Sequence, residues 1–92
     1  MYIHIGADVS IPAEWIIGIF DLDSATGAAP DTVRFLARAE QSNCVDMLTS
    51  DIPRSFIVTM DRVFLSAVSA STLRLRWQRG NEIKLAKDLI RD

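Results

Sequence analysis

The chain has 92 residues, of which 49% are hydrophobic, and a net charge of −2. A chain of this length forms one ordinary domain, and so small a domain buries a modest core and gains from a partner. No apolar run reaches the roughly 20 residues that a membrane-spanning helix requires. The opening also lacks the basic and long apolar segments of a secretion signal. We therefore expect a cytoplasmic protein with no membrane partner.

Alternating and apolar segments predict the strands. Residues 1–5 alternate between apolar and polar side chains, as in a half-buried strand. The run from Trp15 to Phe20 is apolar on both faces, which predicts a central strand covered on both sides, and Gly18 within it indicates a bulge. Residues 44–48 allow a short edge strand. Residues 55–60 and 63–65 are predicted to form a hairpin.

Two segments have helical features. Pro30 occupies a favoured first position and Asp31 adds a negative charge to the first turn, so we expect a helix from about Pro30 to Gln41 that ends near Asn43. Further along, Ser69 and Ser71 are candidate N-caps of a second helix.

The C-terminal region reads as a helix with an extension. Gly80-Asn81 predicts a stop followed by a restart. After it comes a second apolar stripe, formed by Ile83, Ala86, Leu89 and Ile90, which needs a surface to pack on. The sequence thus predicts a small single α+β domain with a mixed or antiparallel sheet, one helix after the central strand, and a C-terminal helix.

The sequence holds no complete metal or catalytic motif. Residues 21–27 resemble a calcium loop, but Ala25 replaces an oxygen ligand, the glycine comes one place late, and Thr32 replaces the terminal glutamate. Cys44 and His4 are the only residues of their types and have no partners at metal-site or nucleophile spacing. We expect no metal, no cofactor, no catalytic residue, and no enzymatic activity.

The charge is distributed unevenly along the chain. Residues 1–53 hold eight acidic side chains and two arginines, whereas residues 54–92 hold eight basic side chains and four acidic ones. Such asymmetry is a hint of a surface that faces a polyanion. The guanidinium group binds phosphate oxygens through a planar fork and keeps its charge at every relevant pH. The candidate nucleic-acid-binding residues are Arg54, Arg62, Arg74, Arg76 and Arg79, although such a set of arginines also fits an ordinary solvated face.

Several segments together resemble a known family. They are the opening residues 1–6, the central residues 17–21, residues 53–59, Leu65-Ser66, and residues 69–73. In order and spacing they are similar to the RemB branch of the bacterial RemA/RemB family of extracellular matrix regulatory proteins. The likeness spans residues 1–79, so residues 80–92 form a helical C-terminal extension.

The resemblance implies a cytoplasmic, non-enzymatic regulator of gene expression that assembles into closed rings. In the RemA branch it also implies binding to double-stranded DNA, upstream of matrix genes, through arginines around the ring. A ring repeats each phosphate contact and so gains avidity. We expect a head-to-tail homo-oligomer built from strand edges.

A second hypothesis remains open. In this second hypothesis, the protein is a ring-forming protein-interaction module without DNA binding. Its acidic first half repels DNA, and its C-terminal helix docks another protein.

Overall fold

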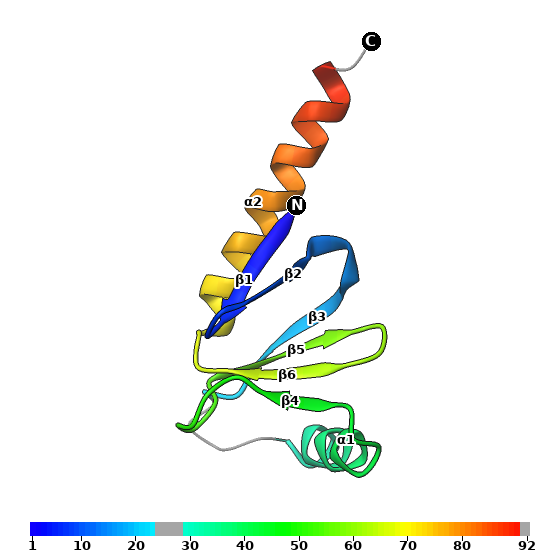
Figure 1. Ribbon diagram of the computed structural model, residues 1–92, viewed down its shortest axis with the longest axis vertical. Helices are drawn as coiled ribbons and strands as arrows, with labels where there is room; N and C mark the ends of the chain where they lie inside the picture. Colours follow the sequence, from blue (N-terminus) through cyan, green and yellow to red (C-terminus); the bar gives the residue numbers. More distant parts are fainter. Residues whose placement is uncertain (24–28, 91–92) are drawn as a thin grey trace.

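The computed structural model describes residues 1–23 and 29–90, with side chains described as far as Asn81. These residues form an α+β domain, as predicted (Figure 1). The elements in chain order are β1 (Tyr2–Gly6), β2 (Val9–Pro12), a short 3-10 helix (Ala13–Trp15), β3 (Ile16–Asp21), α1 (Pro30–Gln41), β4 (Val45–Met47), β5 (Ser55–Thr59), β6 (Val63–Ser66) and α2 (Ala70–Ile90).

The described strands form two sheets. β1 and β2 make an antiparallel pair, joined by a turn in which Ala7 has a positive φ of 48°. The second sheet has the strand order β3-β5-β6-β4. β5 is antiparallel to both β3 and β6, whereas β4 is parallel to β6. The second sheet is therefore mixed, and the predicted β5–β6 hairpin and short edge strand β4 are confirmed.

β3 lies at an edge of the second sheet, so the prediction of a central strand was wrong. Among the described strands it pairs with β5 alone. Ile19 is buried, but Ile17 and Phe20 are 63% and 45% exposed. An apolar run usually indicates cover on both faces, whereas one face of β3 meets the core and the other borders a groove. The register shift between Ile16 and Gly18 confirms the predicted bulge.

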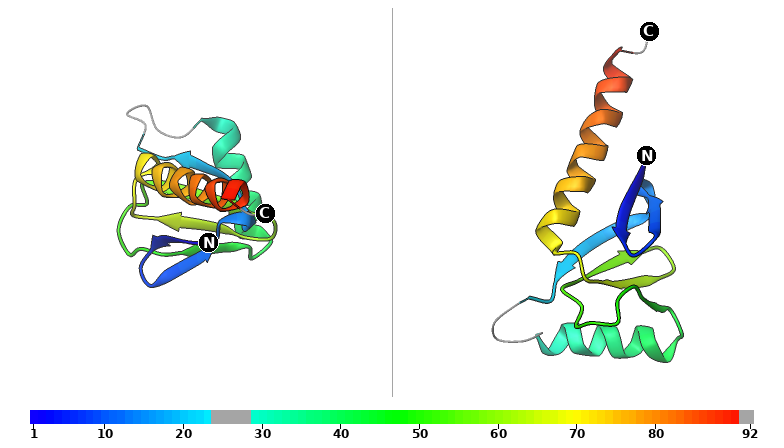
Figure 2. Two further views of the ribbon diagram at one scale, coloured as in Figure 1. Left: turned by 90° about the horizontal axis from the view of Figure 1, so that it is seen from above. Right: turned by 60° about the vertical axis from the view of Figure 1, so that its left-hand side comes forward.

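The core lies between α2, the β1–β2 pair, and one face of the second sheet (Figure 2). Ile5, Ile57 and Leu73 are fully buried and bring β1, β5 and α2 together. The buried Ser66 hydroxyl donates to the Ile5 carbonyl oxygen at 2.5 Å and accepts from the Val68 amide at 3.0 Å. This hydroxyl joins the two sheets without leaving a buried polar group unpaired.

α2 is one continuous helix over Ala70–Ile90, which corrects the predicted stop at Gly80-Asn81. Ser69 caps it, as predicted, by accepting from the Thr72 amide at 3.3 Å. Gly80 is buried against Met1, and a Cβ there would lie 3.0 Å from the Met1 Sδ atom. The glycine therefore permits close packing rather than ending the helix.

The C-terminal part of α2 extends away from both sheets (Figures 1 and 2). The predicted apolar stripe of the extension falls on side chains outside the described ones.

α1 spans Pro30–Gln41, as predicted, and the chain leaves it through Asn43, whose φ is 58°. Asparagine tolerates this left-handed conformation better than most residues. The helix lies beneath the face of the second sheet opposite α2 (Figure 2). Although α1 is amphipathic, none of its residues is buried. Its apolar side chains are covered only in part.

Candidate functional site

Arg62 lies at the tip of the β5–β6 hairpin and is held by a carboxylate from β4. Its Nε donates to Asp46 Oδ2 at 2.6 Å and its Nη2 donates to Asp46 Oδ1 at 2.9 Å. The Thr59 hydroxyl fixes the turn by accepting from the Arg62 amide at 3.0 Å. The hydrogen bond to Asp46, more than any other influence, raises the pKa of Arg62 above its ordinary value. The guanidinium group therefore stays charged and oriented at the surface.

Arg54 immediately precedes β5. Backbone hydrogen bonds fix its position, because its amide donates to the Ser66 carbonyl oxygen at 2.8 Å and its own carbonyl oxygen accepts from the Leu22 amide at 2.9 Å. Its Nε donates to Asp23 Oδ2 at 2.8 Å. The Arg54 side chain is 54% exposed. Like Arg62, it is an accessible cation paired with an acidic residue from the first half of the chain.

The structure does not bring these two arginines together. Arg54 stands before the first residue of β5, and Arg62 follows the turn after its last residue. A five-residue strand is about 17 Å long. The chain therefore presents two separate positive positions at opposite ends of one strand.

The arginines of α2 have different surroundings. Arg74 Nη2 donates to the Ile19 carbonyl oxygen in β3 at 2.9 Å, and Arg76 Nη1 donates to the His4 carbonyl oxygen in β1 at 2.9 Å. These two side chains join α2 to both sheets. Arg79 is exposed, and it makes no hydrogen bond or ion pair with any side chain that the structure describes.

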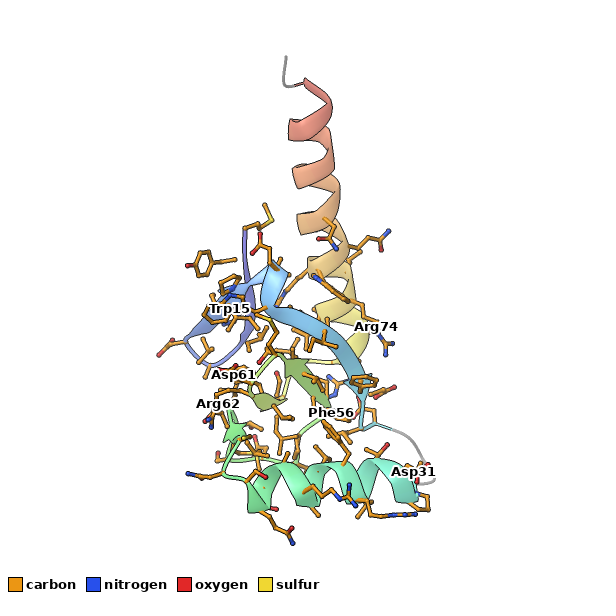
Figure 3. All side chains as sticks on the ribbon, turned by 90° about the vertical axis from the view of Figure 1, so that its right-hand side faces the viewer. Trp15, Asp31, Phe56, Asp61, Arg62 and Arg74 are labelled. Atoms are coloured by element: carbon orange, nitrogen blue, oxygen red, sulfur yellow. The ribbon has the colours of Figure 1, made fainter. Side chains whose placement is uncertain are left out.

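Two open grooves flank α1. The β3-side groove has a volume of about 290 Å³ and an almost wholly apolar lining. Phe56 forms its floor, with its ring stacked on Phe20 at 4.8 Å between centroids and tilted against Phe35 at 6.1 Å. The complete lining is Ile17, Phe20, Asp31, Thr32, Phe35, Phe56 and Val58. Figure 3 shows Phe56 between the sheet and α1, with Asp31 at one end of the helix.

The β4-side groove is larger, at about 470 Å³. Its lining is Leu36, Glu40, Asn43, Val45, Met47 and Leu65. Sequence reasoning missed both grooves, because their residues come from segments far apart in the chain. The one available signal in the sequence was the amphipathic pattern of α1. The sequence could not show that the sheet leaves part of the apolar side of this helix uncovered.

The other polar candidates make local contacts. The His4 Nε2 atom lies 2.7 Å from the Ala7 carbonyl oxygen, and the Cys44 thiol donates to the Ser42 carbonyl oxygen at 3.4 Å. Within residues 1–23 and 29–81, no group of three or more His, Cys, Asp or Glu side chains could hold a metal ion. The segment that resembles a calcium loop lies largely outside the described residues.

No helix in the described part of the chain combines the length and apolar character needed to cross a membrane.

Comparison with known proteins gives a consistent family. The model of the family described as "RemA-like: Extracellular matrix regulatory protein A-like" matches residues 2–77. The chain is also 35% identical over 78 residues to extracellular matrix regulatory protein B of Bacillus subtilis (strain 168). The aligned region covers 85% of this chain and 91% of that protein. This chain therefore belongs to the RemA/RemB family of extracellular matrix regulatory proteins and is RemB-like.

Proposed function

We propose that this protein is a cytoplasmic, non-enzymatic regulator of gene expression that assembles into a ring and binds duplex DNA through arginines. The genes it controls are extracellular matrix genes or related ones. The name of the Bacillus subtilis relative supports the regulatory role. The observation that carries DNA binding is the placement of Arg54 and Arg62 at opposite ends of β5, each with its guanidinium group at the surface.

Two phosphate contacts per subunit bind DNA weakly when the subunit acts alone. The logarithm of the binding constant falls by about 0.9 per phosphate contact for each tenfold rise in salt. A ring presents the same pair of arginines many times, so the second and later contacts become intramolecular and the avidity rises by about 10²- to 10⁴-fold. Assembly thus compensates for a subunit whose net charge is −2.

The test is fluorescence anisotropy of a labelled duplex, titrated between about 50 and 200 mM salt. We expect the double variant Arg54→Ala, Arg62→Ala to bind more weakly to duplexes of unrelated sequence, because phosphate contacts carry no base information. The salt slope should fall by about 1 for each phosphate that the variant no longer binds. The control is Arg34→Ala, which removes an exposed arginine from α1.

Two results would contradict DNA binding through these arginines. One is an unchanged salt slope in the double variant, and the other is an assembled wild-type protein that binds no duplex at low salt.

The second candidate function is a ring-forming protein-interaction module without DNA binding. The β3-side groove favours it, because an exposed apolar patch marks an interaction site more often than an ordinary surface. The ion pairs of Arg54 and Arg62 also favour it, since they reduce the charge available to phosphate. An assembled protein that does not bind DNA at low salt would support this function over the first.

A further inference from the structure

An open hollow lies beside the tip of the β5–β6 hairpin, apart from both grooves of α1. It has a volume of about 290 Å³, and its lining is Trp15, Met60 and Asp61. Trp15 is 48% exposed and Met60 is 73% exposed. Tryptophan is highly buried on average in folded proteins, so a ring half open to solvent is unusual. The apolar part of this hollow is only partly covered by the chain itself.

The pairing of β3 with β5 builds the hollow. Ile16 lies opposite Thr59 in the antiparallel register of these strands. One residue further, the same register places Trp15 across from Met60, within the range at which cross-strand side chains touch. Asp61 follows Met60 in the turn of the hairpin. The backbone of two paired strands therefore fixes the positions of all three side chains.

Asp61 adds a negative charge that has no ionic partner nearby. Among the side chains that the structure describes, no cation forms an ion pair with it. The hydrogen bond that it accepts from the Thr59 hydroxyl is long, at 3.4 Å. Arg62 is directed away, because its two hydrogen bonds go to Asp46 in β4, at the sheet edge opposite β3. Figure 3 shows Trp15, Asp61 and Arg62 in this order along one side of the molecule.

A tryptophan ring beside an unpaired carboxylate favours a cation. The face of the ring attracts a guanidinium or ammonium group that lies within about 6 Å of its centroid. The carboxylate accepts charge-assisted hydrogen bonds from the same group. An arginine side chain fits best, because its planar guanidinium group can stack on the ring while it donates to Asp61. Its aliphatic stem can at the same time cover Met60.

We propose that the hollow formed by Trp15, Met60 and Asp61 binds an arginine side chain of a partner protein. A small free cation would leave the exposed apolar rim uncovered, whereas an arginine presented by a peptide chain brings further atoms that cover it. Tryptophan, methionine and arginine are also enriched in the centres of protein–protein interfaces. This interaction goes beyond the proposed function, because it needs neither the DNA contacts nor the ring.

The experiment uses a short oligo-arginine peptide as the probe and the matching oligo-citrulline peptide as its uncharged counterpart. The chain has two tryptophans, and Trp77 packs against the core. Fluorine NMR of the protein labelled with fluorotryptophan therefore reports on Trp15, with Trp77 as an internal reference. Fluorescence anisotropy of the labelled peptide gives the affinity of each variant, and circular dichroism verifies its fold.

The variants separate the ring from the charge. Trp15→Leu keeps an apolar side chain but removes the aromatic face, and Asp61→Asn removes the charge at nearly constant shape. The matched control is Asp8→Asn, at an exposed aspartate in the turn between β1 and β2 that does not line the hollow.

We expect oligo-arginine to shift the resonance of Trp15 and not that of Trp77, and oligo-citrulline to shift neither. Trp15→Leu and Asp61→Asn should each weaken the binding of oligo-arginine by about two- to fivefold, because each removes one contact of an exposed cation. Asp8→Asn should leave the affinity unchanged.

Three results would overturn this inference. The first is an unmoved Trp15 resonance, whether the peptide binds elsewhere or the hollow is already covered in the assembled protein. The second is an equal loss of affinity in Asp61→Asn and Asp8→Asn, which would reflect the general acidity of the first half of the chain. The third is an equal response to oligo-citrulline, since the hollow would then not select a cation. None of these results depends on whether the protein binds DNA.

Discussion

Asp46 and Asp23 accept hydrogen bonds from the two guanidinium groups that the proposed function assigns to DNA binding. Asp46 makes two hydrogen bonds with Arg62, and Asp23 makes one with Arg54. A phosphate that binds either arginine must replace or share a carboxylate. Exposed pairs of this kind contribute little to stability. They are weak enough for a polyanion to displace, and they also fix the direction in which each cation points.

Asp46→Asn should therefore tighten DNA binding, by about two- to fivefold, because it weakens the hold on Arg62 and removes a negative charge beside it. Asp61→Asn is the matched control. It removes the same charge one residue away from Arg62, but Asp61 makes its hydrogen bond with Thr59. Anisotropy titrations of both variants distinguish the release of Arg62 from a general charge effect. Equal gains for the two would contradict a specific role for the Asp46 pair.

The raised pKa of Arg62 has a defined consequence for pH dependence. A cation whose pKa is higher in the folded state stabilises the fold below its unfolded-state pKa and loses that contribution only as the pH rises through the folded value. Both values lie far above neutral pH. Titration of Arg62 therefore changes neither stability nor phosphate binding across the physiological range.

At the scale of elements, local sequence signals predicted the helix ends correctly, because local contacts determine where a helix begins and ends. Proline and aspartate at the start of α1, asparagine after its end, and Ser69 before α2 satisfy the polar groups or backbone angles of helix ends. The two errors both came from tertiary contacts. β3 is apolar because its second face borders a groove, and Gly80 is small because Met1 packs on it.

Alanine substitutions at Gly80 and Gly18 test whether the neighbour of each glycine can give way to a Cβ. Gly80→Ala should stabilise the protein by up to about 1 kcal/mol, because alanine favours a helix and the Met1 side chain, 50% exposed, can move aside. Gly18→Ala should destabilise it, since a Cβ there would lie 2.7 Å from the Phe20 ring, which is stacked on Phe56. Urea unfolding measures both. A destabilised Gly80→Ala variant would show instead that the Met1 side chain cannot move aside for a Cβ at this position.

At the scale of the whole molecule, composition predicted a basic second half, but it could not predict how the fold would distribute the arginines. Arg54 and Arg62 remain at the surface, whereas Arg74 and Arg76 bind strand carbonyls. The partners of Arg54 and Arg62 lie 31 and 16 residues away in the chain. No sequence spacing predicts such pairs. The grooves beside α1 were hidden for the same reason.

Chelation should leave the folded molecule unchanged. The described residues hold no cluster of metal-binding side chains, and the segment that resembles a calcium loop lacks an oxygen ligand at Ala25. Thermal melts with and without a chelator should coincide in midpoint. A midpoint lowered by several degrees on chelation would contradict the prediction and indicate a structural metal.

The hydrogen bond from Arg74 to β3 also affects solubility. A free sheet edge offers its carbonyl and amide groups to any extended chain, and this is a common start of aggregation. β3 is such an edge and is rich in apolar residues, but the Arg74 guanidinium already donates a hydrogen bond to the Ile19 carbonyl oxygen. A foreign strand would meet a carbonyl oxygen that already accepts a hydrogen bond, and a fixed positive charge beside it. The edge therefore resists indiscriminate strand addition, while the apolar side chains below it stay available to a specific partner.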